Sequence, residues 1–103
     1  MQTIKIVKKD NTIEKFKKDK LFNAVKKSSE RVLVEFTEEQ LKELENGVKV
    51  VIEERFNGMI HVKDLHNVVE MVLATIDKAV ADSYRNYRNY KTDFVSILDN
   101  VYQ

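Results

Sequence analysis

Lysines crowd the first quarter of this chain, where nine of them occur by residue 27 against three acidic residues, although the whole chain carries a net charge of only +1. Lysine binds phosphate as a point charge and needs no special geometry. Lys8 and Lys9 near a turn, with Lys17 and Lys20 at the start of a helix, could therefore converge on one polyphosphate. Glu14 lies between them in sequence and could pair with a lysine or accept a hydrogen bond from a ribose or base. A merely solvated, charged surface is the alternative.

The chain has few residues that could form a metal site, a catalytic nucleophile or a glycine-rich phosphate loop. The absence of cysteine excludes disulfides and cysteine-ligated metal sites. None of the four serines stands in the strand–turn–helix context of a nucleophile elbow, and no glycine-rich phosphate loop is present. His61 and His66 are five residues apart, not the three or four that place two side chains on one helix face. We therefore expect neither a metal site nor catalytic residues.

Length and composition indicate one globular domain. The chain has 103 residues, of which 43% are hydrophobic and 34% charged. No apolar run approaches the roughly 20 residues that cross a bilayer, and the N-terminus lacks the apolar core of a secretion signal. We expect a cytoplasmic protein without membrane contact. The near-neutral charge argues against a DNA-binding domain, so no nucleic-acid partner is expected.

The first sixteen residues predict a β-hairpin. Residues 3–8 and 12–16 alternate between apolar and polar, which is typical of strands. Asp10 and Asn11 between them suit the positive φ angles of a two-residue turn.

Helical periodicity dominates the rest of the chain. Helices are expected over residues 18–32, from Thr37 to Asn57-Gly58, over residues 62–75, and from Asp77 onwards. Thr37 with Gln40 forms a capping-box pattern, and Gly58 suits the left-handed conformation that closes helices. The predicted fold class is α+β, mainly α, with a four-helix cluster capped by a small N-terminal β-hairpin or sheet.

Three segments resemble the ATP-cone domain family. The first runs from Lys8-Lys9-Asp10-Asn11 through Glu14 and Phe16 to Lys20-Leu21, and the second spans residues 60–66. The third is Ala81-x-x-Tyr84-x-x-Tyr87-Arg88. They follow one another at the family's spacing over residues 3–91. The chain departs from the family's usual pattern at Lys9 (usually arginine), Asn11 (usually glycine) and Val62 (a hydroxyl residue in some members).

The resemblance implies a regulatory site for ATP or dATP, accompanied by Mg²⁺. By position, Lys8, Lys9 and Lys20 would hold phosphates, and Glu14 and Lys17 would lie against the nucleoside. His66 would lie near the base or ribose. Arg88 or Lys91 would complete the phosphate side.

The resemblance also suggests a host. ATP-cones mostly regulate the large subunit of ribonucleotide reductase, and the start at Met1, one step before the first strand, favours that enzyme over a repressor with an upstream zinc ribbon. We expect residues 1–91 to form the cone and residues 92–103 to begin a helical connection to a missing catalytic domain. The expected partners are that domain and other reductase subunits, with self-association possible. The alternatives are the cone of a nucleotide-responsive transcriptional repressor, or a degenerate cone serving as a helical interaction module.

Overall fold

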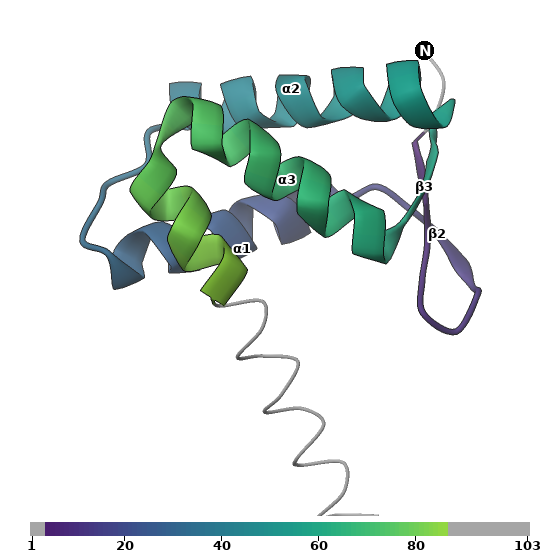
Figure 1. Ribbon diagram of the computed structural model, residues 1–103, viewed down its shortest axis with the longest axis horizontal. Helices are drawn as coiled ribbons and strands as arrows, with labels where there is room; N and C mark the ends of the chain where they lie inside the picture. The colour runs from purple at the N-terminus through teal and green to yellow at the C-terminus, as the bar shows by residue number, and fades with distance from the viewer. Residues whose placement is uncertain (1–3, 87–103) are drawn as a thin grey trace, which may run out of the picture.

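The computed structural model describes residues 4–86 (Figure 1). Its elements follow the order β1 (Lys5–Val7), β2 (Ile13–Lys15), α1 (Lys18–Arg31), α2 (Glu38–Phe56), β3 (Met59–His61) and α3 (Val62–Ile76). Residues 78–86 form a further helical segment. The expected mainly helical α+β fold with a small N-terminal sheet is confirmed.

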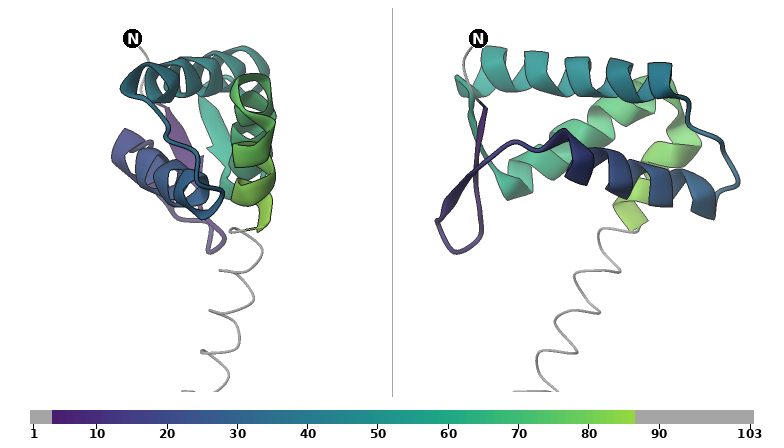
Figure 2. Two further views of the ribbon diagram at one scale, coloured as in Figure 1. Left: turned by 90° about the vertical axis from the view of Figure 1, so that its left-hand side faces the viewer. Right: turned by 180° about the vertical axis from the view of Figure 1, so that it is seen from behind.

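The three strands form one small sheet in the order β2-β1-β3. β1 pairs antiparallel with β2 and parallel with β3, with Ile6 opposite both Glu14 and Ile60. Alternation places Ile4 and Ile6 on the inner face, where both are buried, while Lys5 faces outward. The helices lie on one side of this sheet, and its outer face forms one end of the molecule (Figure 2).

The hairpin turn has one residue more than the sequence suggested. The amide of Asn11 donates to the carbonyl of Lys8 at 2.9 Å, and Asn11 takes a φ of 67°. Residues 8–11 form a four-residue turn that ends on a left-handed residue. The loop between Lys8 and Thr12, whose backbones pair, therefore has three residues, a common length in hairpins. Asp10 braces it, because its Oδ1 accepts bonds from the amide and the hydroxyl of Thr12.

The helix boundaries follow the local signals in the sequence. The capping box of Thr37 and Gln40 is present, and Asp77 Oδ1 accepts from the amide of Val80 at 3.2 Å to begin the helix over 78–86. α2 closes on two left-handed residues, Asn57 (φ 54°) and Gly58 (φ 84°). The expected helices are thereby confirmed within the described residues.

The sequence did not predict the strand β3. It has only three residues and lies directly between the end of α2 and the start of α3. Its Ile60 is 1% exposed, and the carbonyl of Gly58 accepts from the amide of Lys5 at 2.9 Å. β1 and β2 are as short, but they stand in longer alternating stretches joined by a turn signal, whereas no such stretch surrounds β3.

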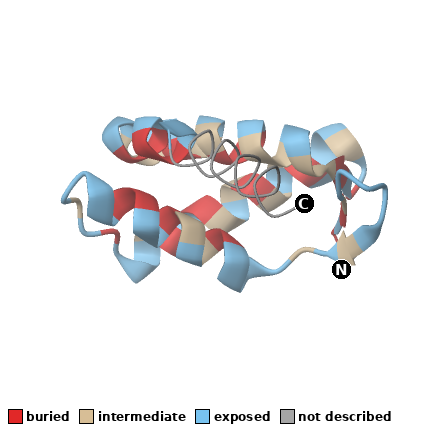
Figure 3. Cartoon of the chain, turned by 90° about the horizontal axis from the view of Figure 1, so that it is seen from below, coloured by how far each residue is buried: buried red, intermediate tan, exposed pale blue. Residues whose placement is uncertain are grey.

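The core lies where the helices face one another and the sheet (Figure 3). Its most deeply buried side chains come from every helix and from β3. Those below 2% exposure are Leu44, Ile52, Ile60, Leu73, Val25, Val48, Val69, Val80 and Ser28. Within this core the hydroxyl of Ser83 donates a hydrogen bond of 2.7 Å to the carbonyl of Ser28. This bond joins the helix over 78–86 to α1. The last helix is thus packed against the first.

Gly47 permits the close approach of α2 and α3. A Cβ atom at this position would lie 2.8 Å from Cγ1 of Val72 on α3. The favourable helix propensity of alanine, about 1 kcal/mol over glycine, is therefore opposed by a steric clash.

We expect Gly47→Ala to lower the free energy of unfolding by about 1–3 kcal/mol, the usual cost of overpacking a core. Thermal unfolding of the variant measures this. Combining it with Val72→Ala removes the methyl groups that clash, so the double variant should be more stable than the sum of the two single effects implies. Strict additivity of the two changes would contradict the close contact.

Candidate functional site

A small cavity lies between the hairpin, α1, α3 and the helix over 78–86, with a volume of about 170 Å³. Its polar lining comprises Glu14, Lys17, Lys20, His66 and Tyr84. Its apolar lining comprises Ile6, Phe16, Leu21, Ala24, Val62, Leu65 and Val69. Segments far apart in the sequence therefore form one mostly apolar cavity with charged side chains at its edge. We call it the cone cavity.

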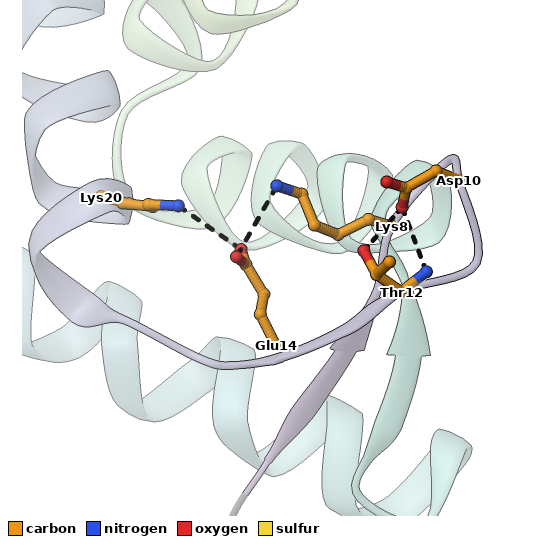
Figure 4. Close-up of polar contacts among 5 residues, drawn as sticks. All are labelled: Lys8, Asp10, Thr12, Glu14 and Lys20. Atoms are coloured by element: carbon orange, nitrogen blue, oxygen red, sulfur yellow. Dashed lines mark hydrogen bonds and ion pairs between the residues drawn. The ribbon is translucent and has the colours of Figure 1, made fainter.

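The carboxylate of Glu14 lies between two lysines (Figure 4). Its Oε2 is 3.7 Å from Nζ of Lys8 on the hairpin, and its Oε1 is 3.5 Å from Nζ of Lys20 on α1. Both distances exceed those of a charge-assisted hydrogen bond, and both lysines are about half exposed or more. Exposed pairs of this kind contribute about 0–1 kcal/mol. Glu14 thus gathers two ammonium groups without binding either tightly.

Lys17 extends this cluster at the start of α1. It lines the cone cavity and occupies the N-cap position, but among the described residues no side chain caps the helix there. The first-turn amides of α1 are consequently available to an acceptor, and the helix dipole favours an anion at this end. Two cations and a helix N-terminus therefore border the cone cavity, and Lys8 adds a third cation through its contact with Glu14.

Lys9 does not join this group. It lies exposed in the turn, outside the lining of the cone cavity. Its neighbour Asp10 serves the turn, and the hydrogen bonds that it accepts from Thr12 lower the pKa of its carboxyl below the ordinary value. In this structure the turn residues hold the shape of the hairpin, while Lys8 alone of the turn region reaches Glu14.

His66 and Tyr84 meet at the inner wall of the cavity. Nδ1 of His66 is 2.9 Å from the hydroxyl of Tyr84, and the rings are inclined by 49° at a centroid distance of 6.2 Å. Tyr84 is only 4% exposed. The sequence analysis treated Tyr84 as part of a family motif and gave it no role in the site; no spacing signal links residues 18 positions apart on different helices.

The structure thus brings together most of the expected site residues. Glu14, Lys17, Lys20 and His66 line the cone cavity, and Lys8 reaches it through Glu14. Arg88 and Lys91 lie outside the described residues, as does the segment 92–103. Val62 lines the cavity with an aliphatic side chain where some relatives of the family pattern carry a hydroxyl.

The arrangement suits a ligand with an apolar, planar part and an anionic tail. At about 170 Å³ the cavity is smaller than the roughly 300–1,000 Å³ typical of ligand pockets. It can therefore enclose only part of a nucleotide-sized molecule, and Lys17 and Lys20 lie in its lining. Within residues 4–86 no group of three or more histidine or acidic side chains could hold a metal ion, and no helix there is long and apolar enough to span a membrane.

Comparison with known proteins supports the resemblance. The family model described as ATP cone domain matches residues 4–93. The transcriptional repressor NrdR of Neorickettsia sennetsu is 30% identical over 105 residues, an alignment covering 98% of this chain and 68% of that protein. NrdR of Streptococcus pneumoniae strain Hungary19A-6 is 26% identical over 106 residues, covering 99% and 66%. The chain spans about two thirds of the length of these relatives.

The expected host is wrong. The similar curated proteins are named transcriptional repressors, which contradicts a regulatory domain of ribonucleotide reductase and a part of an enzyme. The expected reductase subunits are therefore wrong as partners. The expectation of no nucleic-acid partner is also wrong, because a transcriptional repressor acts on DNA. The position of the first residue, Met1, carries no information about the host.

The contact between His66 and Tyr84 can be tested by a double-mutant cycle. Tyr84→Phe keeps the buried ring and removes only the hydroxyl, so we expect a loss of about 0.5–1.5 kcal/mol in the free energy of unfolding. With His66→Ala already present, Tyr84→Phe should cost clearly less, because its partner is gone. Urea unfolding of the four proteins measures the coupling. Equal costs in both backgrounds would show that the two side chains do not interact.

Proposed function

Because this chain belongs to the ATP-cone domain family, we propose that it is the nucleotide-sensing part of a transcriptional repressor. Domains of this family bind ATP or dATP as effectors. The names of the similar repressors support this kind of host, and the lining of the cone cavity supports it as the nucleotide site.

The observation that carries the proposal is the gathering of Lys8, Lys20 and Glu14 beside an apolar hollow. In the proposed complex the adenine enters the hollow between Phe16 and the aliphatic side chains of α1 and α3. The triphosphate lies at its edge, where its oxygens replace the carboxylate of Glu14 as the partner of the two ammonium groups. The exchange is favourable because the triphosphate carries several negative charges and Glu14 one, at pair distances already long.

The other residues of the cavity take roles consistent with their places. Lys17 and the first-turn amides of α1 face the phosphate side, and His66 faces the nucleoside, held by Tyr84. Glu14, released from the lysines, accepts a hydrogen bond from the sugar. Among the described residues no group of three or more histidine or acidic side chains could hold a metal ion, so a magnesium ion that accompanied the triphosphate would depend on phosphate oxygens, with at most one or two carboxylates of the protein.

Regulation follows from linkage. ATP and dATP differ by one 2′-hydroxyl, and each can shift the repressor between two states only by the difference in its affinity for them. A contact that senses this hydroxyl must therefore differ between the two states. We assign this role to Glu14 and His66, two of the polar side chains that line the cavity.

Calorimetric titration with ATP, dATP and GTP tests the proposal. We expect ATP and dATP to bind at one site and GTP to bind more weakly, because a hollow of about 170 Å³ leaves little room for the exocyclic amino group of guanine. Lys20→Ala and Lys8→Ala should each weaken binding at least tenfold, since a hydrogen bond to a charged group contributes about 1.5–3 kcal/mol. Lys26→Ala, an exposed lysine two turns along α1 and outside the cavity, is the matched control.

Three results would separate the alternatives. Unchanged affinity in the Lys8 and Lys20 variants would place the site elsewhere. The absence of any nucleotide binding would leave only a degenerate cone acting as a helical module. Equal binding of all polyanions, with affinity falling steeply with salt, would indicate a nonspecific cationic surface.

A further inference from the structure

Phe16 belongs to the apolar wall of the cone cavity and also contacts a helix outside that wall. It lies in the two-residue link between β2 and α1. Its amide donates to the carbonyl of Ile4 at 3.0 Å, so its backbone is held against the start of β1. Its ring is half-buried, packs against the core and lines the cavity. The backbone is thus fixed, while the orientation of the ring depends on the side chains around it.

A cation from α2 lies over this ring. Nζ of Lys49 is 5.9 Å from the ring centroid, within the distance of about 6 Å at which a cation is attracted to the π-face of an aromatic ring. Among the described residues the lining of the cone cavity comes from the hairpin, the start of α1, α3 and the helix over 78–86, and Lys49 does not belong to it. The ring of Phe16 therefore separates the ammonium group from the cavity.

Glu45 holds this lysine in place. Its carboxylate lies one turn before Lys49 on α2, and its Oε2 is 3.0 Å from Nζ of the lysine. The side chain of Glu45 is 15% exposed, so this pair is both shorter and less exposed than the two pairs of Glu14. A lysine that only covered apolar surface would extend its ammonium group into water. Here the ammonium group is kept beside a carboxylate and over an aromatic ring.

We propose that Lys49 is a positioning residue for the nucleotide base and acts through Phe16. This inference rests on the proposed function, in which adenine enters the cavity beside Phe16. The cation–π contact keeps the ring in the orientation that the base meets, so less side-chain freedom is lost when the nucleotide binds. The ammonium group also offsets the negative charge of the π-face, which lowers the repulsion between the ring and an electron-rich base. α2 thereby contributes to affinity without touching the nucleotide.

This role differs from that of the lysines assigned to the triphosphate. Lys20 lines the cavity and acts on the phosphates directly, whereas Lys49 is separated from the ligand by an aromatic ring. Loss of Lys20 should therefore weaken every ligand that carries the triphosphate. Loss of Lys49 should weaken only a ligand that also carries a base.

Calorimetric titration of ATP into the unmodified chain and into Lys49→Met tests the proposal. Methionine keeps an unbranched aliphatic side chain and removes the charge. We expect ATP to bind about three- to tenfold more weakly, a loss in the range of one cation–π contact. Lys49→Arg should keep most of the affinity, because a guanidinium group also stacks on aromatic faces. Undiminished binding of ATP by Lys49→Met would overturn the proposal.

Lys42→Met is the matched control. Lys42 lies exposed on the same helix, outside the cavity, and its replacement changes the net charge equally. This variant should bind ATP as the unmodified chain does. A loss equal to that of Lys49→Met would show a general effect of charge and would overturn the role of Lys49.

Two further readouts separate an action through Phe16 from a purely structural role. In the background of Phe16→Leu, Lys49→Met should cause no further loss of ATP affinity, because the ring through which it acts is gone. Inorganic tripolyphosphate, titrated at low ionic strength where ionic contacts are strongest, should bind equally to the unmodified chain and to Lys49→Met, and more weakly to Lys20→Ala. Equal costs of Lys49→Met in both backgrounds, or equal weakening of ATP and tripolyphosphate, would refute the assignment.

Failure of this inference is distinguishable from failure of the proposed function. If the unmodified chain binds no ATP, the cone cavity is not a nucleotide site and both are overturned. If ATP binds and Lys20→Ala weakens it while Lys49→Met does not, only the role of Lys49 is overturned.

Discussion

The parallel pairing of β1 with β3 holds the rest of the site in place. Ile6 and Ile60 face each other in this pairing and are 5% and 1% exposed, so the central strand is fixed by both hydrogen bonds and burial. β1 carries the hairpin, and β3 leads directly into α3. The pairing therefore sets the distance between the lysines of the hairpin and the histidine of α3. Without it the cavity would lose one wall.

Glu14 also organises the positive charges around the cone cavity. The lysines of the first quarter would repel one another in a compact hairpin, and Glu14 reduces that repulsion by lying between Lys8 and Lys20. Because these pairs are long and largely exposed, they stabilise the fold little and can be exchanged for other partners. The same side chain thus holds the two ammonium groups near each other without binding either tightly. Lys5 and Lys15, on the other face of the sheet, have no such carboxylate directly opposite them in the sheet pairing.

The sequence predicted the parts of this structure that depend on local chemistry. The capping box at Thr37, the helix start at Asp77 and the turn at Asn11 are signals carried by neighbouring residues, and they appear in the structure, although the turn is one residue longer than predicted and only Asn11 takes a positive φ. β3 and the contact of His66 with Tyr84 depend on residues from distant segments of the chain, so no local sequence pattern predicts either feature. The host was mispredicted because the residues that resemble the family build the cone itself, whichever protein carries it. Whether the lined-up side chains bind a nucleotide remains a prediction.

The order of the strands also governs how the molecule folds. β1 and β2 are joined by a short turn and can pair early, whereas β1 meets β3 only after the whole of α1 and α2 has been made and a long loop has been closed. The central strand is thus completed late. During synthesis the cone cavity cannot form until the chain has emerged well past its midpoint, because α3 and Tyr84 supply part of its lining, while the cationic hairpin is already exposed.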